Sequence, residues 1–119
     1  MIQKNETYAI QENKLIINGH VIVFEDHIKE VVEMSNMLIV LILKRSGITP
    51  NQNVFGVSIS QKKIIWQIGK LFSENDDQSC PFVGIRNYNN KLYLNNWCDV
   101  FLIVDSLTGQ VIEKGASGK

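Results

Sequence analysis

Short apolar runs alternate with tight-turn residues along this chain, and no other feature restricts its fold so strongly. The clearest example is "KLIINGHVIV" (14–23), in which Asn18-Gly19 separates two apolar runs. An Asn-Gly pair readily adopts the positive φ angles that a two-residue type I′ hairpin turn requires. The sequence therefore predicts that residues 15–17 and 20–23 pair as antiparallel strands.

Further strand-like runs follow as far as the C-terminal region, and short polar turns such as Asn89-Asn90 join many of them. The segment 25–34 is ambiguous, because it combines a helical spacing of apolar residues with a β-branched content that suits a strand. We favour a strand. The predicted strands after the first hairpin are 25–34, 37–43, 54–59, 63–68, 82–88, 91–97, 100–104 and 110–114. We expect a single all-β domain over 1–119, an antiparallel meander of about eight to ten short strands.

The run "MLIVLIL" (37–43) has no alternation of apolar and polar residues. It is far too short for a transmembrane helix, which needs about 20 residues. A strand with this pattern is covered on both faces. It is therefore either a central strand or a strand whose outer face meets a partner.

One hairpin plan occurs twice. The stretches "NVFGVSISQKKIIWQI" (53–68) and "DVFLIVDSLTGQVIEK" (99–114) share it. At an offset of 47 residues, 53–67 align with 100–114 without gaps, which pairs Val57 with Val104. Periods of this length are typical of propeller blades. Both copies resemble the strand pair of PQQ-like β-propeller repeats, the first in its tryptophan and the second in its "DSLTG" turn. The resemblance implies blade-like hairpins near 53–69 and 99–114.

A closed propeller needs at least four blades, or roughly 160 residues. The chain has 119 residues, which leaves room for about two and a half blades. We therefore expect an incomplete β-propeller or an open barrel or sandwich. The sequence offers no basis for the quinone cofactor, and we expect no cofactor at all.

Charge and cysteine content suggest a compartment and exclude some partners. Twelve basic and twelve acidic residues cancel, at a sequence pI near 6.7, so net charge does not favour nucleic acid or an anionic membrane. The polar N-terminal segment lacks the apolar core of a signal peptide, so we expect a cytoplasmic protein. Cys80 and Cys98 could form a disulfide, but we favour two buried free thiols.

No catalytic or metal-binding pattern is evident. The two histidines, His20 and His27, have no sequence context that marks a nucleophile and its base. In "EDH" (25–27), adjacent residues of a strand would point to alternate faces and could not converge on a metal. We therefore predict that the protein is not an enzyme and binds no metal.

The two tryptophans are predicted to differ in role. Trp66 shares a strand face with Ile64 and Ile68, which favours the core. Trp97 shares a face with Lys91, so it is the better candidate for contact with a partner.

An enzyme is the weakest of the functional hypotheses.

The order "INGHVIVFEDHIKEVVE…MLIVLIL…NVFGVSISQKKIIWQI…NNKLYLNNWCDVFLIVDSLTGQVIEK" resembles small uncharacterised bacterial proteins of the immunity or antitoxin type. This resemblance implies a binding protein that neutralises a toxin directly. Charge complementarity would steer acidic side chains toward a basic toxin, although a solvated acidic surface is the simpler explanation. The alternative is a self-associating module, such as a homodimer, which the run 37–43 suggests. The candidate partner-binding residues are Glu25, Asp26, Glu30, Glu33, Glu74, Asp76, Asp77 and Trp97.

Overall fold

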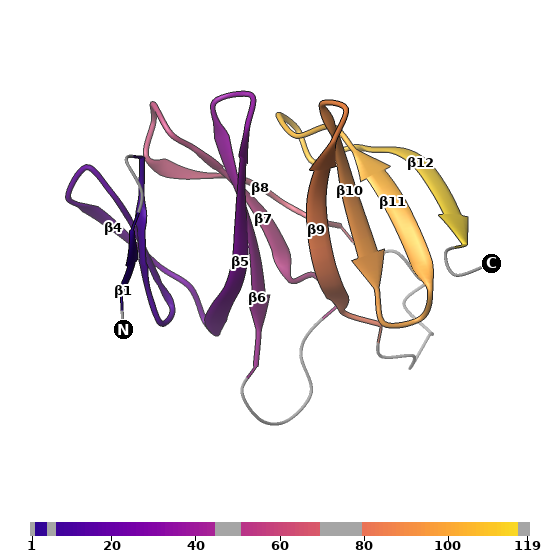
Figure 1. Cartoon of the computed structure of the whole chain (residues 1–119), viewed down its shortest axis with the longest axis horizontal. Helices are drawn as coiled ribbons and strands as arrows, with labels where there is room; N and C mark the ends of the chain where they lie inside the picture. Colours follow the sequence, from indigo (N-terminus) through magenta and orange to yellow (C-terminus); the bar gives the residue numbers. More distant parts are fainter. Residues whose placement is uncertain (1, 5–6, 45–50, 70–79, 117–119) are drawn as a thin grey trace.

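The computed structural model describes residues 2–4, 7–44, 51–69 and 80–116, which form three four-stranded antiparallel sheets. We call these sheets blades 1, 2 and 3; they lie side by side in chain order along the longest axis (Figure 1). Blade 1 consists of β1 (Ile2–Lys4), β2 (Ala9–Gln11), β3 (Lys14–Ile17) and β4 (His20–Val23). Blade 2 consists of β5 (His27–Met34), β6 (Met37–Leu43), β7 (Val54–Ser58) and β8 (Lys63–Gln67). Blade 3 consists of β9 (Phe82–Tyr88), β10 (Lys91–Asn96), β11 (Val100–Val104) and β12 (Val111–Ala116).

The all-β prediction is confirmed, and β5 is a strand as predicted. The number of strands was underestimated: the described residues form twelve, and the chain holds three blades instead of two and a half. The prediction missed β1 and β2, because each has only three residues and lies in a polar segment. Such short strands let blade 1 fit into the first 23 residues of the chain.

Tight turns join the strands where the sequence predicted them. Asn18 and Gly19 between β3 and β4 have φ angles of 48° and 82°. Positive φ angles also occur at Asn89-Asn90 in blade 3 and at Ser35-Asn36 in blade 2. Asn and Gly tolerate this left-handed region better than other residues, so the local sequence determines where these hairpins turn.

Strand β6 lies between two separate cores, which confirms its assignment as a central strand. Leu38, Val40 and Ile42 belong to the cluster between blades 1 and 2. Ile39 and Leu41 point the other way, into the cluster between blades 2 and 3. Successive side chains of a strand point to opposite faces, so an uninterrupted apolar run is required where both faces are buried.

The repeat found at an offset of 47 residues is structural. Its two copies are β7–β8 and β11–β12, the third and fourth strands of consecutive blades. Their strand registers shift at equivalent places, after Gly56 in one blade and after Ile103 in the other. Both turns close with a backbone hydrogen bond of 2.8 Å, from Lys62 N to Ser58 O and from Gly109 N to Asp105 O.

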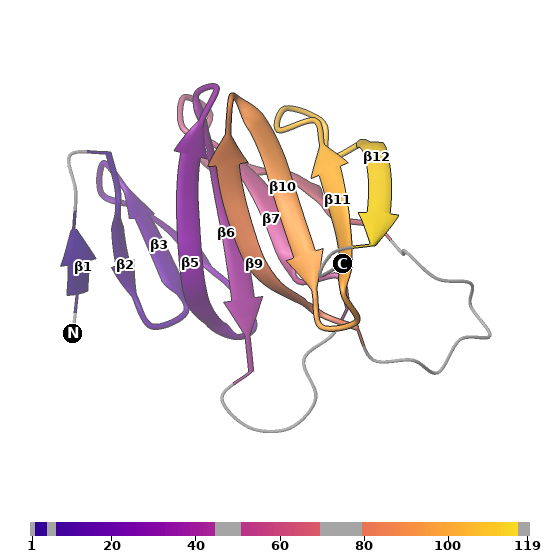
Figure 2. The same ribbon diagram turned by 45° about the vertical axis from the view of Figure 1, so that its right-hand side comes forward.

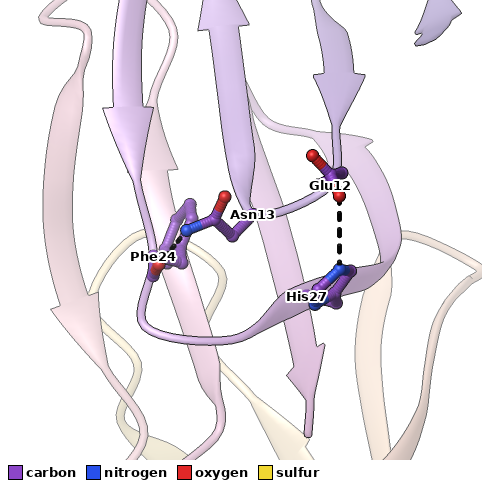
Figure 3. Close-up of polar contacts among 4 residues, drawn as sticks. All are labelled: Glu12, Asn13, Phe24 and His27. Atoms are coloured by element: carbon purple, nitrogen blue, oxygen red, sulfur yellow. Dashed lines mark hydrogen bonds and ion pairs between the residues drawn. The ribbon is translucent and has the colours of Figure 1, made fainter. Parts of the chain in front are cut away.

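Blade 1 is connected to blade 2 by a short clamp of hydrogen bonds (Figure 3). Phe24 N donates to Asn13 O at 2.8 Å, and Asn13 Nδ2 donates to Phe24 O at the same distance. Ile28 N, at the start of β5, donates to Glu12 O at 3.0 Å. His27 Nε2 lies 3.9 Å from Glu12 Oε1, and the two side chains are 35% and 62% exposed, so this contact contributes little stability.

Trp66 connects blade 2 to blade 3. Its ring is 7% exposed, as the core prediction expected, and its Nε1 donates to Ser106 O in the β11–β12 turn at 2.8 Å. Two glycines make room for the ring: a Cβ atom on Gly56 would collide with it, and one on Gly109 would lie 2.6 Å from ring carbons. The tryptophan of one blade thus docks into the turn of the next.

The free-thiol prediction for the two cysteines is wrong. Cys80 and Cys98 form a disulfide, with Cα atoms 5.5 Å apart. It ties the start of blade 3 to the loop between β10 and β11, where Trp97 N also donates to Pro81 O at 2.9 Å. Disulfides are typical of oxidising compartments, so the cytoplasmic prediction loses the support of the free thiols.

Asn53 is a buried polar link between blades 2 and 3. Its Nδ2 donates to Ile42 O and to Phe82 O, and its Oδ1 accepts from Phe82 N, each at 2.9 Å. We expect Asn53→Ala to lower the free energy of unfolding by about 2 kcal/mol, because buried backbone groups lose their partners. Urea unfolding measures this effect, with Asn87→Ala on the exposed part of β9 as the control. Equal stability of the two variants would contradict the assignment.

Candidate partner-binding site

Blade 3 has one face in the core and one face turned away from blade 2. Along β10, Leu92 and Leu94 are buried against blade 2. Tyr93 and Asn95 alternate with them and therefore lie on the opposite side of the sheet. The register places Lys91, Ile103 and Glu113 on this side as well. We call the group of Arg86, Tyr88, Tyr93, Asn95 and Phe101 on this side the aromatic face.

The side chains of the aromatic face contact one another. The Arg86 Cζ atom lies 5.8 Å from the ring centre of Tyr88 and 5.9 Å from that of Tyr93. The Tyr93 ring centre is 6.0 Å from that of Tyr88 and 6.2 Å from that of Phe101. Cation–π contacts at exposed sites are worth about 0.5–1 kcal/mol each. These contacts hold the cluster in a defined arrangement before any partner arrives.

A shallow cavity of about 440 Å³ lies in this face. Arg86 and Asn95 provide polar groups at the cavity, while Tyr93 and Phe101 provide aromatic surface. A Cβ atom on Gly115 of β12 would lie 2.6 Å from ring atoms of Phe101, so the glycine lets this ring lie flat against the sheet. Tyrosine and arginine dominate binding energy at protein interfaces, and their combination here suits a protein partner.

The predicted acidic residues that the structure describes do not form one surface. Glu25 and Asp26 lie in the β4–β5 connection and line a second cavity, of about 220 Å³, together with Phe24 and Phe55. Glu30 is half-buried, and its Oε1 accepts a hydrogen bond from the backbone N–H of blade 3 residue Ile85 at 3.2 Å. That contact holds two blades together.

Glu33 and Trp97 do not line that cavity. Glu33 is exposed on β5, and Trp97 is 73% exposed beside the disulfide. Glu74, Asp76 and Asp77 lie outside the described residues.

The aromatic face was not predicted from the sequence, although a signal for it was present. A two-residue turn at Asn89-Asn90 places Arg86 opposite Tyr93, which is the observed register. Counting outward from this turn would have shown that an arginine and two tyrosines share one face of the hairpin. What the sequence could not show is which face of blade 3 remains uncovered.

The described residues also bear on metal binding and membrane insertion. No group of three or more histidine, cysteine, aspartate or glutamate side chains among them is placed to hold a metal ion. Those same residues include no helix long and apolar enough to span a membrane.

Three meandering four-stranded sheets stacked in chain order define a β-propeller-like fold. The chain is similar to the β-propeller protein BamB from Moraxella catarrhalis, at a TM-score of 0.58 and 15% identity, over 95% of this chain and 35% of that one. It is similar to the computationally designed Ika8 protein at a TM-score of 0.60 and 9% identity, over 98% of this chain and 36% of that one. The chain therefore spans about a third of the length of these structures.

A family model described as "Domain of unknown function (DUF7957)" matches residues 5–116. The chain belongs to this family. No curated protein matches it.

Proposed function

We propose that this protein is a non-catalytic protein-binding module and that the aromatic face of blade 3 receives its partner. The observation that carries the proposal is the gathering of Arg86, Tyr88, Tyr93 and Phe101 on a sheet face turned away from the other blades. Tyr88 is 56% exposed, so much aromatic surface is open to a partner. Rigid aromatic side chains lose little conformational entropy on binding, which favours their use as anchors.

A capture experiment with two variants tests this proposal. Affinity-tagged wild-type protein is expected to retain a specific partner from a lysate of its own cells, quantified by mass spectrometry. Arg86→Glu combined with Tyr88→Glu should reduce that capture at least about tenfold, which corresponds to a loss of 1.4 kcal/mol in binding. Both residues are exposed, so the variant is expected to remain folded.

The matched control is Ile65→Lys on β8, which changes a 41% exposed apolar residue of the middle blade. It should capture as much partner as the wild type. Equal capture by the wild type and the Arg86/Tyr88 variant would show that the aromatic face is not the binding site.

Toxin neutralisation stays a prediction of the sequence resemblance, and a cytoplasmic location stays a prediction from the polar N-terminal segment. The proximity of Glu25 and Asp26 at one cavity is compatible with a basic partner there. The aromatic face carries an arginine, however, and does not require a basic partner.

A further inference from the structure

Within the chain, consecutive blades stack in the same relative orientation. At each of the two interfaces, one face of the earlier blade meets the opposite face of the later blade. Blade 1 contributes Leu15 and Ile17, which pack in one cluster with Leu38 and Val40 of blade 2. The other side of blade 2 packs in the same way against the inner face of blade 3. Among the described residues, the middle blade therefore packs against a neighbouring blade on both sides, and each end blade packs against one on a single side.

The side of blade 1 that no other described blade covers is partly aliphatic. The strand register places Ile16 beside Ala9 on β2 and Val21 on β4. By alternation, Val23 shares this side, opposite to the buried Leu15 and Ile17, and it also reaches the cavity that Phe24 and Phe55 line. The register places Lys14, which is exposed, and Gln11 on the same side, with Lys14 opposite Val23. We call the apolar members, Ala9, Ile16, Val21 and Val23, the aliphatic face. Val21 is 47% exposed and Val23 is 62% exposed.

We infer that the partner of the aromatic face is a second copy of this chain, which docks with its aliphatic face. This inference rests on the proposed function, because it names the occupant of the same site. A second copy would present blade 1 in the position that a fourth blade would take in the existing stack. Figure 2 shows the three sheets side by side in chain order. Opposite faces of consecutive blades meet at both interfaces inside the chain, and the same order would continue across the two molecules.

Such a contact is heterologous, since it joins two different surfaces of the same protein. Burial of Val21 and Val23 against the tyrosine and phenylalanine rings would stabilise it, at about 25 cal/mol for each Å² of apolar surface removed from water. The contact lacks the tryptophan that links blades 2 and 3: at the 47-residue offset, Glu113 takes the position of Trp66. We therefore expect reversible association that depends on protein concentration.

Sedimentation velocity with complementary variants tests the inference. Wild-type protein should shift with concentration from a mass of 13.5 kDa to at least twice that value. Val21→Lys with Val23→Lys disrupts the aliphatic face, and Arg86→Glu with Tyr88→Glu disrupts the aromatic face. Each double variant alone should remain a monomer. An equimolar mixture should form a dimer, because it contains one intact copy of each surface.

The control Ile65→Lys should associate like the wild type. A wild-type chain that stays monomeric, or a mixture that does not regain the dimer, would overturn the inference. So would association that survives the Val21/Val23 changes, because two aromatic faces would then be meeting. If the chain is monomeric but the capture experiment still depends on Arg86 and Tyr88, the second-copy inference fails while the proposed function stands.

A cross-linking measurement keeps the test valid if a lysine variant fails to fold. Mixed Val23→Cys and Tyr88→Cys proteins should form a disulfide-linked heterodimer under mild oxidation. A mixture of Val23→Cys and Ile65→Cys should form at least about tenfold less, since the middle blade is outside the contact. Equal yields from the two mixtures would contradict the docking.

Discussion

Trp66→Ala is expected to lower the free energy of unfolding by about 4 kcal/mol, the largest effect of any single substitution that we predict. The ring is 7% exposed, and it fills the space between Gly56 on its own blade and Gly109 on the next. Its removal would leave a cavity between blades 2 and 3 and would leave the carbonyl of Ser106 without its donor. Urea unfolding followed by far-UV circular dichroism measures the loss.

Two other variants separate the causes of this effect. Trp66→Phe keeps an aromatic ring but removes the N–H donor, so it should lose about 1–2 kcal/mol beyond any repacking. Trp97→Ala removes the other tryptophan, which is 73% exposed, and should change stability by less than about 0.5 kcal/mol. Similar losses for Trp66→Ala and Trp97→Ala would mean that Trp66 does not link the blades.

Removal of the disulfide is expected to have the second-largest effect. Cys80 and Cys98 are 18 residues apart, and closing a loop of this length stabilises a fold by about 3 kcal/mol through the entropy of the unfolded chain. The double variant Cys80→Ser and Cys98→Ser should lose that amount in urea unfolding. Wild-type protein unfolded in urea with a reducing agent should show the same loss.

Thiol titration provides a separate check on the disulfide. Unfolded, unreduced protein should show no reactive thiol, because the described residues contain no free cysteine. Cys98→Ser alone should expose one thiol, at Cys80. Two reactive thiols in the wild type would mean that both cysteines are free, as the sequence predicted. The double serine variant would then have no disulfide to lose, and no loss of stability would be expected from that cause.

The hairpins could be predicted because their signals are local. Asn18-Gly19 and Asn89-Asn90 define their turns through the backbone angles that Asn and Gly tolerate, and the structure has these turns. The run 37–43 likewise required burial on both faces, which is what β6 has. These predictions depend on residues that are close in the chain, so no knowledge of the tertiary structure was needed.

The complete repeat was harder to recognise because one connection differs in length. Ten residues separate β6 from β7, whereas three separate β10 from β11. The inner hairpins of blades 2 and 3 are therefore offset by 54 residues, as Ser35 and Asn89 show, while the outer hairpins are offset by 47. An alignment without gaps recovers only the outer hairpins, so it did not detect that the inner hairpins of the two blades also correspond.

The candidate site could not be assembled from the sequence, because the sequence does not show which side chains the stacked blades leave exposed. Glu30 was predicted to contact a partner, yet it accepts a hydrogen bond from the backbone of blade 3. Arg86 and Tyr93 were not predicted, yet they lie together on a face that no other blade is seen to cover. The cysteines were assigned as thiols because the sequence does not show that residues 80 and 98 are neighbours.

The sequence by itself determined ten of the twelve described strands, most of the tight turns and the repeated outer hairpin, because short-range steric preferences and the two-residue alternation of a strand specify them. The tertiary structure alone decided which side of each blade is buried and how Trp66, Asn53 and the disulfide join elements distant in the chain. The physical reason is that these contacts depend on packing between whole sheets. One side of a strand looks much like the other until a neighbouring blade covers it.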